Sequence, residues 1–197
     1  MGLLSPVDRN KSLSPRQGTA YLASQAIYAA GAEGLAWRVR SGVVRLDTTT
    51  QDGANSFASL AIAGDIVGCE TMLFGAYTFS ASALTHCELS PWPEGEPVGT
   101  SESLLESLAL AQSRAADVIA LRGGQASDRV LGLIRLLGGG AGQVVLPTRQ
   151  DIADITNLRF ETISRIIKGL ERVGVLQPVK MEGVHATRGY AVNLAAA

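Results

Sequence analysis

Apolar and polar residues alternate over short segments in the first half of the chain. Val44 and Leu46, for example, alternate with Arg45 and Asp47. A repeat of two is typical of strands that bury one face and expose the other. Glycines separate these segments at the spacing of turns in a small sandwich or barrel. The pattern predicts an all-β domain whose strands lie within the segments 27–34, 35–42, 43–53, 56–65, 66–73 and 78–89.

The apolar repeat changes to that of a helix after the proline-rich stretch SPWPEGEPVG at 90–99. Ser101 or Ser103 can cap this helix, because a serine hydroxyl accepts a hydrogen bond from one of its first N–H groups. Five apolar residues then recur at spacings of four and three, as in a coiled-coil seam: Leu104, Leu108, Ala111, Ala115 and Val118. Such a seam can pack on the chain's own β-domain. A heptad repeat favours the same helix of a second copy instead, so we expect a homodimer.

A second helix is predicted from residue 127 to 137, and it ends at the glycine run of 138–142. Because glycine destabilises helices, this run forms a joint before the last part of the chain. We therefore divide the chain into three parts: a β-domain at 1–99, a dimerisation helix at 100–123 and a C-terminal domain at 124–197.

The segment from Thr148 to Val173 predicts two helices separated by a tight turn. Thr148 stands three residues before Asp151, the spacing of a capping box, and Asn157 suits the left-handed conformation of a helix-helix turn. The first helix would bury Ile152, Ala153 and Ile155, and the second would bury Ile163, Ile166, Ile167, Leu170 and Val173. Two further strands around a turn near residues 182–183 would form a wing. This order predicts a winged helix-turn-helix.

The polar face of the second helix carries the candidate DNA-binding residues, because a major groove admits a helix of this kind. Arg165 can donate two hydrogen bonds to guanine, Glu161 can accept one from cytosine, and Ser164 can do either. We therefore expect base contacts from these three residues. The candidates for the DNA backbone are Thr148, Arg149 and Gln150 at the start of the first helix, with Thr162 and Lys168 on the second.

Composition and charge agree with this prediction. Hydrophobic residues make up 46% and charged residues 18% of the 197, as in globular proteins with a real core. The net charge is only −1, but residues 1–144 carry −3 and residues 145–197 carry +2, so the C-terminal part is the basic one. The sequence holds neither a long apolar span nor a signal-like N-terminus, and only two cysteines. We expect a cytoplasmic protein that does not bind membranes.

The chain resembles the CRP/FNR family of bacterial transcription regulators over nearly its whole length. Residues 146–176 are similar to the family's winged helix, GDIVGCETMLFG and FSASALTHCEL are similar to its cyclic-nucleotide-binding-like β-roll, and residues 101–122 are similar to its dimerisation helix. The resemblance implies an α+β fold: an N-terminal β-roll (a double-stranded β-helix), a long dimerisation helix and a C-terminal winged helix-turn-helix. It also implies three partners: double-stranded DNA, a second copy of the chain, and RNA polymerase if the protein activates transcription.

The recognition helix resembles the FNR type within this family. Residues 161–165 read ETISR, which matches the Glu-x-x-Ser-Arg pattern of FNR-type members, and Phe160 stands where CRP-type members carry arginine. The resemblance therefore implies a two-fold DNA site with half-sites of the TTGAT kind, read by Glu161, Ser164 and Arg165.

The β-roll lacks the residues that the family's known effectors need. The candidate effector pocket comprises Gly68, Cys69, Glu70, Phe79 and Ser80, and residues 46–113 contain no lysine or arginine. A buried phosphate without a cation is costly, which argues against cyclic AMP. Cys69 and Cys87 are too few for a four-thiolate iron–sulfur cluster. We therefore expect no cofactor, although haem ligation through His86 stays open, and the sequence identifies no effector.

Two other functions are alternatives to this prediction. In the first, Cys69 and Cys87 sense redox state, or His86 and Cys87 bind haem, and DNA binding is the output. A regulator that needs no small ligand, and whose activity depends only on the amount of protein, is a variant of the main prediction. The second is an enzyme, but the sequence offers no Ser/His/Asp set, no phosphate-binding Gly-Lys motif and only two histidines. We therefore expect no enzymatic activity.

Overall fold

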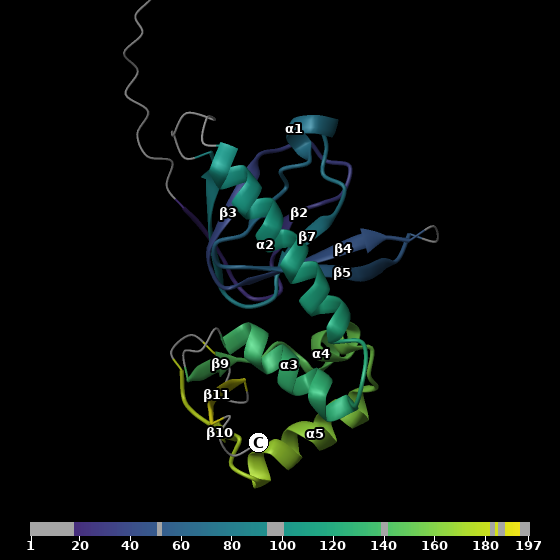
Figure 1. The fold of residues 1–197 in the computed structure, drawn as a ribbon, viewed down its shortest axis with the longest axis vertical. Coiled ribbons are helices and arrows are strands. Elements are labelled where there is room, and N and C mark those ends of the chain that lie inside the picture. Colours follow the sequence, from purple (N-terminus) through teal and green to yellow (C-terminus); the bar gives the residue numbers. More distant parts are fainter. Residues whose placement is uncertain are drawn as a thin grey trace, which may run out of the picture.

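The computed structural model describes residues 18–50, 53–93, 101–138, 142–181, 184 and 188–193, with side chains in the first long helix described from residue 105 onward. Several expectations fall outside these residues: the capping serines 101 and 103, the side chain of Leu104, most of the glycine run and the turn of the wing. In the described part, a β-roll is followed by a long helix and a winged helix-turn-helix domain (Figure 1).

The β-roll consists of short antiparallel strands in two sheets. One sheet has the order β1-β8-β3-β6, formed by Thr19–Tyr21, Cys87–Trp92, Ala36–Ser41 and Ile66–Val67. The other has the order β2-β7-β4-β5, formed by Ala26–Tyr28, Ser80–Ala83, Val43–Thr49 and Asn55–Ile62. Small and β-branched residues fill the space between them, as the alternating pattern predicts: Val39, Val44, Ala61, Val67, Ala81, Ala83, Cys87 and Leu89.

One segment of the roll differs from the sequence prediction. Residues 66–73 were expected to form a strand, but β6 ends at Val67 and the helix α1 occupies Thr71–Phe74. Gly68 makes the change possible because its φ of +74° lies in the left-handed region. A Cβ at this position would also lie 2.6 Å from the ring of Tyr77. The chain therefore leaves the sheet at a glycine that a larger residue cannot replace without strain.

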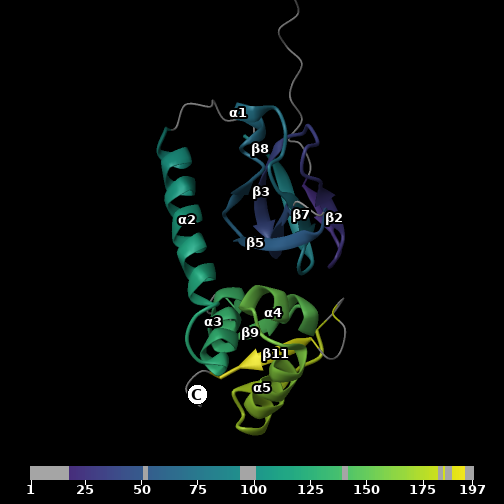
Figure 2. The ribbon, with the colours of Figure 1, turned by 90° about the vertical axis from the view of Figure 1, so that its right-hand side faces the viewer.

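The long helix α2, Ser101–Ala120, connects the roll to the C-terminal domain. Figure 2 shows it along one side of the roll, and its contacts there are with β5. The helix α3, Ala126–Gly138, follows after a short turn and buries Val130, Leu133 and Ile134. None of the helices in the described part combines the length and the apolarity that crossing a bilayer requires.

The C-terminal domain contains α4 (Arg149–Thr156), α5 (Phe160–Arg172) and a sheet of order β10-β11-β9. The predicted wing strands are β10, Leu176–Pro178, and β11, Gly189–Val192. The third strand, β9 at Gln143–Val145, was not predicted, because three residues are too few for a period to show. In both views α5 lies at the end of the molecule remote from the roll, and α4 lies between the two (Figures 1 and 2).

A single hydrophobic cluster joins the roll to the C-terminal domain. Val43, Phe57, Leu60 and Leu84 of the roll belong to the same cluster as the buried residues of α3, α4 and α5. The two parts of the chain therefore share apolar surface, in addition to the separate core inside the roll. This arrangement confirms the predicted α+β fold and adds a contact between the roll and α4 that the sequence did not predict.

Candidate DNA-binding site

The start of α4 is the capping box that the sequence predicts. The Thr148 side chain accepts a hydrogen bond from the Asp151 N–H at 3.1 Å, and the Asp151 carboxylate accepts one from the Thr148 N–H at 3.2 Å. These bonds satisfy backbone donors that a helix start leaves free. Ile152, Ala153 and Ile155 are buried, as predicted. The first helix of the motif is thus fixed at its start by its own side chains.

Asn157 makes the turn between α4 and α5. Its φ of 52° and ψ of 47° are left-handed, and its N–H donates to the carbonyl of Ala153. Most L-residues are disfavoured in this conformation because Cβ approaches the following carbonyl oxygen, whereas asparagine tolerates it. The turn sets the angle at which α5 leaves α4.

Replacing Asn157 therefore tests the turn. We expect Asn157→Ala to lower the free energy of unfolding by about 1 kcal/mol, because alanine adopts this conformation less readily. Asn157→Gly is the matched control and should be nearly neutral. Urea unfolding of both variants measures the difference. Equal stability of the two variants would contradict this role of the backbone conformation.

The helix α5 is strongly amphipathic. Ile163, Ile167 and Leu170 are buried, and Ile166 is half-buried. The prediction for Val173 is wrong, because that side chain is 57% exposed. The reason is that α5 ends at Arg172, and the chain leaves the helical path at Val173 and turns at Gly174. The buried face is therefore one turn shorter than the apolar repeat suggests.

The opposite face of α5 presents the predicted base-reading residues. Glu161 and Arg165 are exposed and Ser164 is half-buried, and their spacing of three and four residues places them on one face. Lys168 is exposed on the same face and Thr162 is half-buried at its edge. The structure thus brings the predicted set together on the part of the molecule farthest from the roll (Figure 2).

The three residues at the start of α4 are bonded within the protein. Thr148 belongs to the capping box, and Gln150 Nε2 donates to Asp154 Oδ1 at 2.9 Å. The side chain of Arg149 hydrogen-bonds the hydroxyl of Tyr190. Thr148 and Gln150 remain exposed and Arg149 is half-buried, so contact with a phosphate stays a prediction for all three.

Tyr190 connects the wing to both helices of the motif. Its hydroxyl donates to Glu171 Oε1 at 2.8 Å and also interacts with Arg149. Burial raises the pKa of Tyr190, the bond to Glu171 raises it further, and Arg149 lowers it, with a net rise. The hydroxyl therefore stays protonated at neutral pH and keeps its donor role. Sequence reasoning missed this link, because a tyrosine in a short strand has no distinguishing pattern.

The face of α2 that points away from the roll carries an apolar stripe whose composition differs from the predicted seam. Val118 was expected in the seam, but it is 4% exposed and packs in the chain's own core. Leu108 and Ala115 are exposed as expected, and Ala111 is exposed beside them. The exposed apolar stripe contains Leu105, Leu108, Ala115 and Ile119. It therefore shares two residues with the predicted seam and has Ile119 in place of Val118. The face of α2 that packs inward carries Val118 together with the half-buried Ser107 and Arg114.

The candidate effector pocket of the roll lies beside two stacked tyrosines. The ring of Tyr77 packs on Gly68 and stacks on Tyr28 with centroids 3.7 Å apart. Glu70 accepts hydrogen bonds from Thr78, and Ser80 Oγ accepts one from the backbone of Ala30 at 3.0 Å. Cys69 and Phe79 are half-buried. The polar side chains of this set thus have partners within the roll, and the one charge among them is negative.

The adjacent residues His86 and Cys87 lie in different surroundings. Cys87 is fully buried and its thiol donates to the carbonyl of Val43, whereas the adjacent His86 is exposed. Both cysteines are free thiols. In the described residues there is no cluster of three or more His, Cys, Asp or Glu side chains that could hold a metal ion.

Alkylation tests the redox hypothesis. Burial, and secondarily the charge of Glu70, raise the pKa of the Cys69 thiol above its ordinary value. We therefore expect Cys69 in the native protein to react more slowly with iodoacetamide at pH 7 than in the unfolded chain, because the thiolate is the nucleophile. After alkylation, DNA affinity should be unchanged. A large loss of affinity would instead support thiol sensing.

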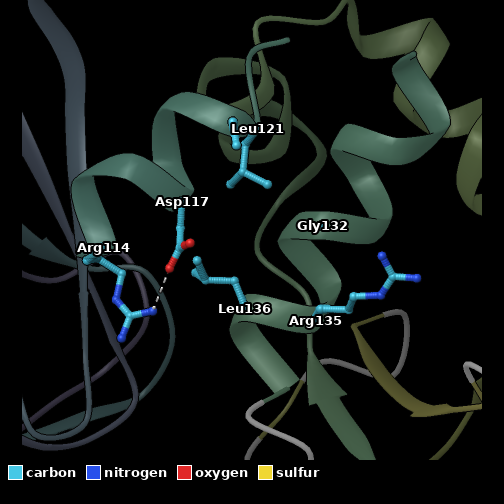
Figure 3. A pocket seen from close by; sticks show the side chains of 7 residues that line it. Arg114, Asp117, Leu121, Gly132, Arg135 and Leu136 are labelled. Atoms are coloured by element: carbon cyan, nitrogen blue, oxygen red, sulfur yellow. Dashed lines mark ion pairs between the residues drawn. The ribbon is translucent and has the colours of Figure 1, made fainter. Parts of the chain in front are cut away.

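A cavity of about 370 Å³ lies between α2 and α3 (Figure 3). Arg114 and Asp117 from α2 and Arg135 from α3 surround an apolar floor that includes Leu121 and Leu136. Arg114 forms ion pairs of 3.6 Å with Asp117 and with Asp65 of the roll. Two arginines and one aspartate line the cavity, and Asp65 of the roll, outside the lining, also pairs with Arg114, so no strong charge of one sign is left for a ligand.

Helix packing, the capped turn, the polar face of α5 and the wing define this protein as a helix-turn-helix DNA-binding regulator. Comparison with known proteins makes the class more specific. No model of a known protein family matches the chain. It is 30% identical over 163 residues to the nitrogen fixation regulation protein FixK of Rhizobium meliloti, a match that covers 80% of this chain and 76% of that protein. The FixK of Bradyrhizobium diazoefficiens is 33% identical over 156 residues, which cover 71% of this chain and 65% of the relative.

Solved structures show the same fold. A CRP-family transcriptional regulator from Thermus thermophilus superimposes with a TM-score of 0.71 at 24% identity, covering 90% of this chain and 93% of that one. FixK2 from Bradyrhizobium japonicum gives 0.66 at 24% identity, covering 89% and 91%. The chain belongs to the CRP/FNR family of DNA-binding transcription regulators.

Proposed function

We propose that this protein acts as a homodimer on a two-fold symmetric DNA site with half-sites of the TTGAT kind. The exposed polar face of α5 is the observation that carries the proposal. Glu161, Ser164 and Arg165 lie there together, and Arg165 can form two hydrogen bonds to the edge of a guanine. The ETISR sequence gives the half-site through its resemblance to FNR-type members.

The apolar stripe of α2 supports the dimer. Leu105, Leu108 and Ile119 are 65%, 54% and 73% exposed in the single chain, and they recur along one face of the helix. Packing this stripe against its copy removes apolar surface from water and places two recognition helices on one DNA duplex. The reading helices then approach successive major grooves about one DNA turn apart.

The regulatory input is proposed to differ from that of cyclic-AMP-binding and iron–sulfur members of the family. Glu70 is the one charged residue of the candidate pocket and is acidic, and residues 46–113 contain no lysine or arginine. A buried phosphate would find no cation in this segment, which is costly. RNA polymerase is a partner if the protein activates transcription.

Selection from random DNA with the purified protein tests the proposal. We expect an enriched palindrome with TTGAT-like half-sites, and the absorbance spectrum of the same sample shows whether haem or a cluster is bound. The selected palindrome should bind much more tightly than a duplex with a single half-site. An enriched sequence without two-fold symmetry would contradict the dimer, and a palindrome with unrelated half-sites would contradict the reading of ETISR.

A further inference from the structure

Arg45 of the roll contacts the first helix of the DNA-binding motif. Its Nε hydrogen-bonds Asp47 at 2.9 Å on the same strand, and its Nη1 bonds Asp151 at 3.0 Å and Asp154 at 3.1 Å on α4. The Arg45 side chain is only 13% exposed. One guanidinium therefore binds three carboxylates and connects two parts of the chain more than a hundred residues apart.

A second set of contacts supports the same connection. The guanidinium carbons of Arg45 and Arg122 both lie over the ring of Phe57 on β5, at 5.7 and 5.2 Å from its centroid. Arg122, in the turn between α2 and α3, donates to the carbonyls of Asp154 and Ile155. The β4–β5 hairpin, the α2–α3 turn and α4 thus meet at one ring.

Arginines hold α4 from both ends of the helix. Arg122 and Arg129 donate to carbonyls near its C-terminus, at residues 154, 155 and 156. Arg45 binds the carboxylate of Asp151 in the first turn, which also forms the capping box, and that of Asp154 in the second turn. The charges of Arg122, Arg129 and Asp151 are favourable where they lie, since cations suit the carbonyl end of a helix and carboxylates suit its N–H end.

Apolar packing alone does not fix the orientation of α4 on the roll. The apolar attraction in the cluster around Val43, Phe57 and Leu60 is non-directional, so it defines the angle of α4 less sharply than hydrogen bonds do. Charged hydrogen bonds with planar geometry are directional, and an arginine that loses one carboxylate partner in a half-buried site leaves charge incompletely paired. The orientation of α4 sets that of α5, because the two helices are joined by the short turn at Asn157 and pack against each other.

We propose that Arg45 is a positioning residue for DNA binding, which holds α4 through Asp151 and Asp154 so that α5 keeps one orientation relative to the roll. In the dimer this fixes the distance and the angle between the two recognition helices. The inference rests on the proposed dimer. It predicts that the full-length protein discriminates sharply between half-site spacings before any small ligand is added.

Half-site spacing measures this role directly. Each added base pair moves a half-site by about 3.4 Å and turns it by about 35°. Binding of the full-length protein is compared on palindromes with the best spacing and with two base pairs more or fewer. Asp154→Lys places a cation against Arg45, and Asp154→Glu keeps the negative charge. We expect Asp154→Lys to reduce the discrimination between spacings about tenfold and Asp154→Glu to retain it.

Two controls separate positioning from a loss of stability. Arg38→Ala removes another arginine of the roll, whose guanidinium contacts the carbonyl of Gly64 in the same domain, and should leave spacing selectivity unchanged. Affinity for a single half-site should be similar in Asp154→Glu and Asp154→Lys after normalisation to random DNA. Loss of half-site binding in Asp154→Lys alone would mean that the domain itself is damaged, and would overturn the positioning role.

Hydrogen exchange of the free full-length protein provides a test without DNA. If Arg45 holds α4, Asp154→Lys should speed exchange of the α4 amides and of the β4–β5 hairpin, while α5 amides remain protected. Unchanged exchange together with unchanged spacing selectivity would overturn the inference. A wild-type protein that binds a palindrome no better than one half-site would contradict the proposed dimer instead, and the exchange result would still decide the role of Arg45.

Discussion

Arg165→Ala is expected to weaken binding to the specific DNA site by about 1–3 kcal/mol, which is about 5- to 150-fold in affinity. The physical reason is the loss of two hydrogen bonds to one base, which leaves the acceptor atoms of that base unpaired in the interface. Binding to random DNA should change much less, because it depends mainly on phosphate contacts. Competition between specific and random duplexes at a fixed salt concentration measures both.

Arg165→Lys is the sharper control for this prediction. Lysine keeps the positive charge but lacks the planar pair of donors, so the variant should still lose most of the specific affinity. It should keep the salt dependence of the wild type, since that dependence counts neutralised phosphates. If Arg165→Lys binds the specific site as tightly as the wild type, charge alone accounts for the contact and the base-reading role is wrong.

Leu108→Glu is expected to produce monomers. Leu108 is 54% exposed in the single chain and lies in the stripe that we assign to the dimer, so the variant should fold but bring two like charges together in the assembled helix pair. Two linked half-site contacts gain about 10²- to 10⁴-fold over one, and the monomer loses this gain on a palindrome. Sedimentation gives the state of association, and titration of palindrome and half-site duplexes gives the loss.

Ser113→Glu is the matched control on the same helix. Ser113 is exposed but lies outside the stripe, and the change introduces the same charge. It should leave the dimer and the palindrome affinity unchanged. A dimeric Leu108→Glu protein would show that another surface holds the two copies together, whereas monomers in both variants would indicate a general effect of charge on α2.

The elements that sequence reasoning predicted well are those whose signal is local. The capping box at Thr148 and the left-handed turn at Asn157 depend on residues within a few positions of each other, and both are confirmed. The amphipathic helix α5 repeats its apolar residues over enough turns to show its buried face. Errors occurred where that repeat ended, because the exit of the chain at Gly174 turns Val173 outward.

The features that were missed depend on contacts between distant segments. The alternation along β4 predicts that Arg45 faces outward from the roll, and its side chain does so. That face is then covered by α4, whose position no local pattern specifies. Val118 shows the same limit, since it fits the apolar repeat of the predicted seam but lies on the face of α2 that packs in the chain's own core, and only packing decides between the two.

The apolar cluster shared by the roll and the C-terminal domain has a consequence for protein engineering. A winged helix expressed without residues 1–100 would expose to solvent the surface that Val43, Phe57 and Leu60 cover in the full chain. The same contact makes simple chimeras unsuitable. A foreign sensor domain fused at α2 would need a hairpin with a matching apolar surface, and an arginine opposite the two aspartates of α4. The natural unit of exchange in this protein therefore includes the β4–β5 hairpin along with the DNA-binding domain.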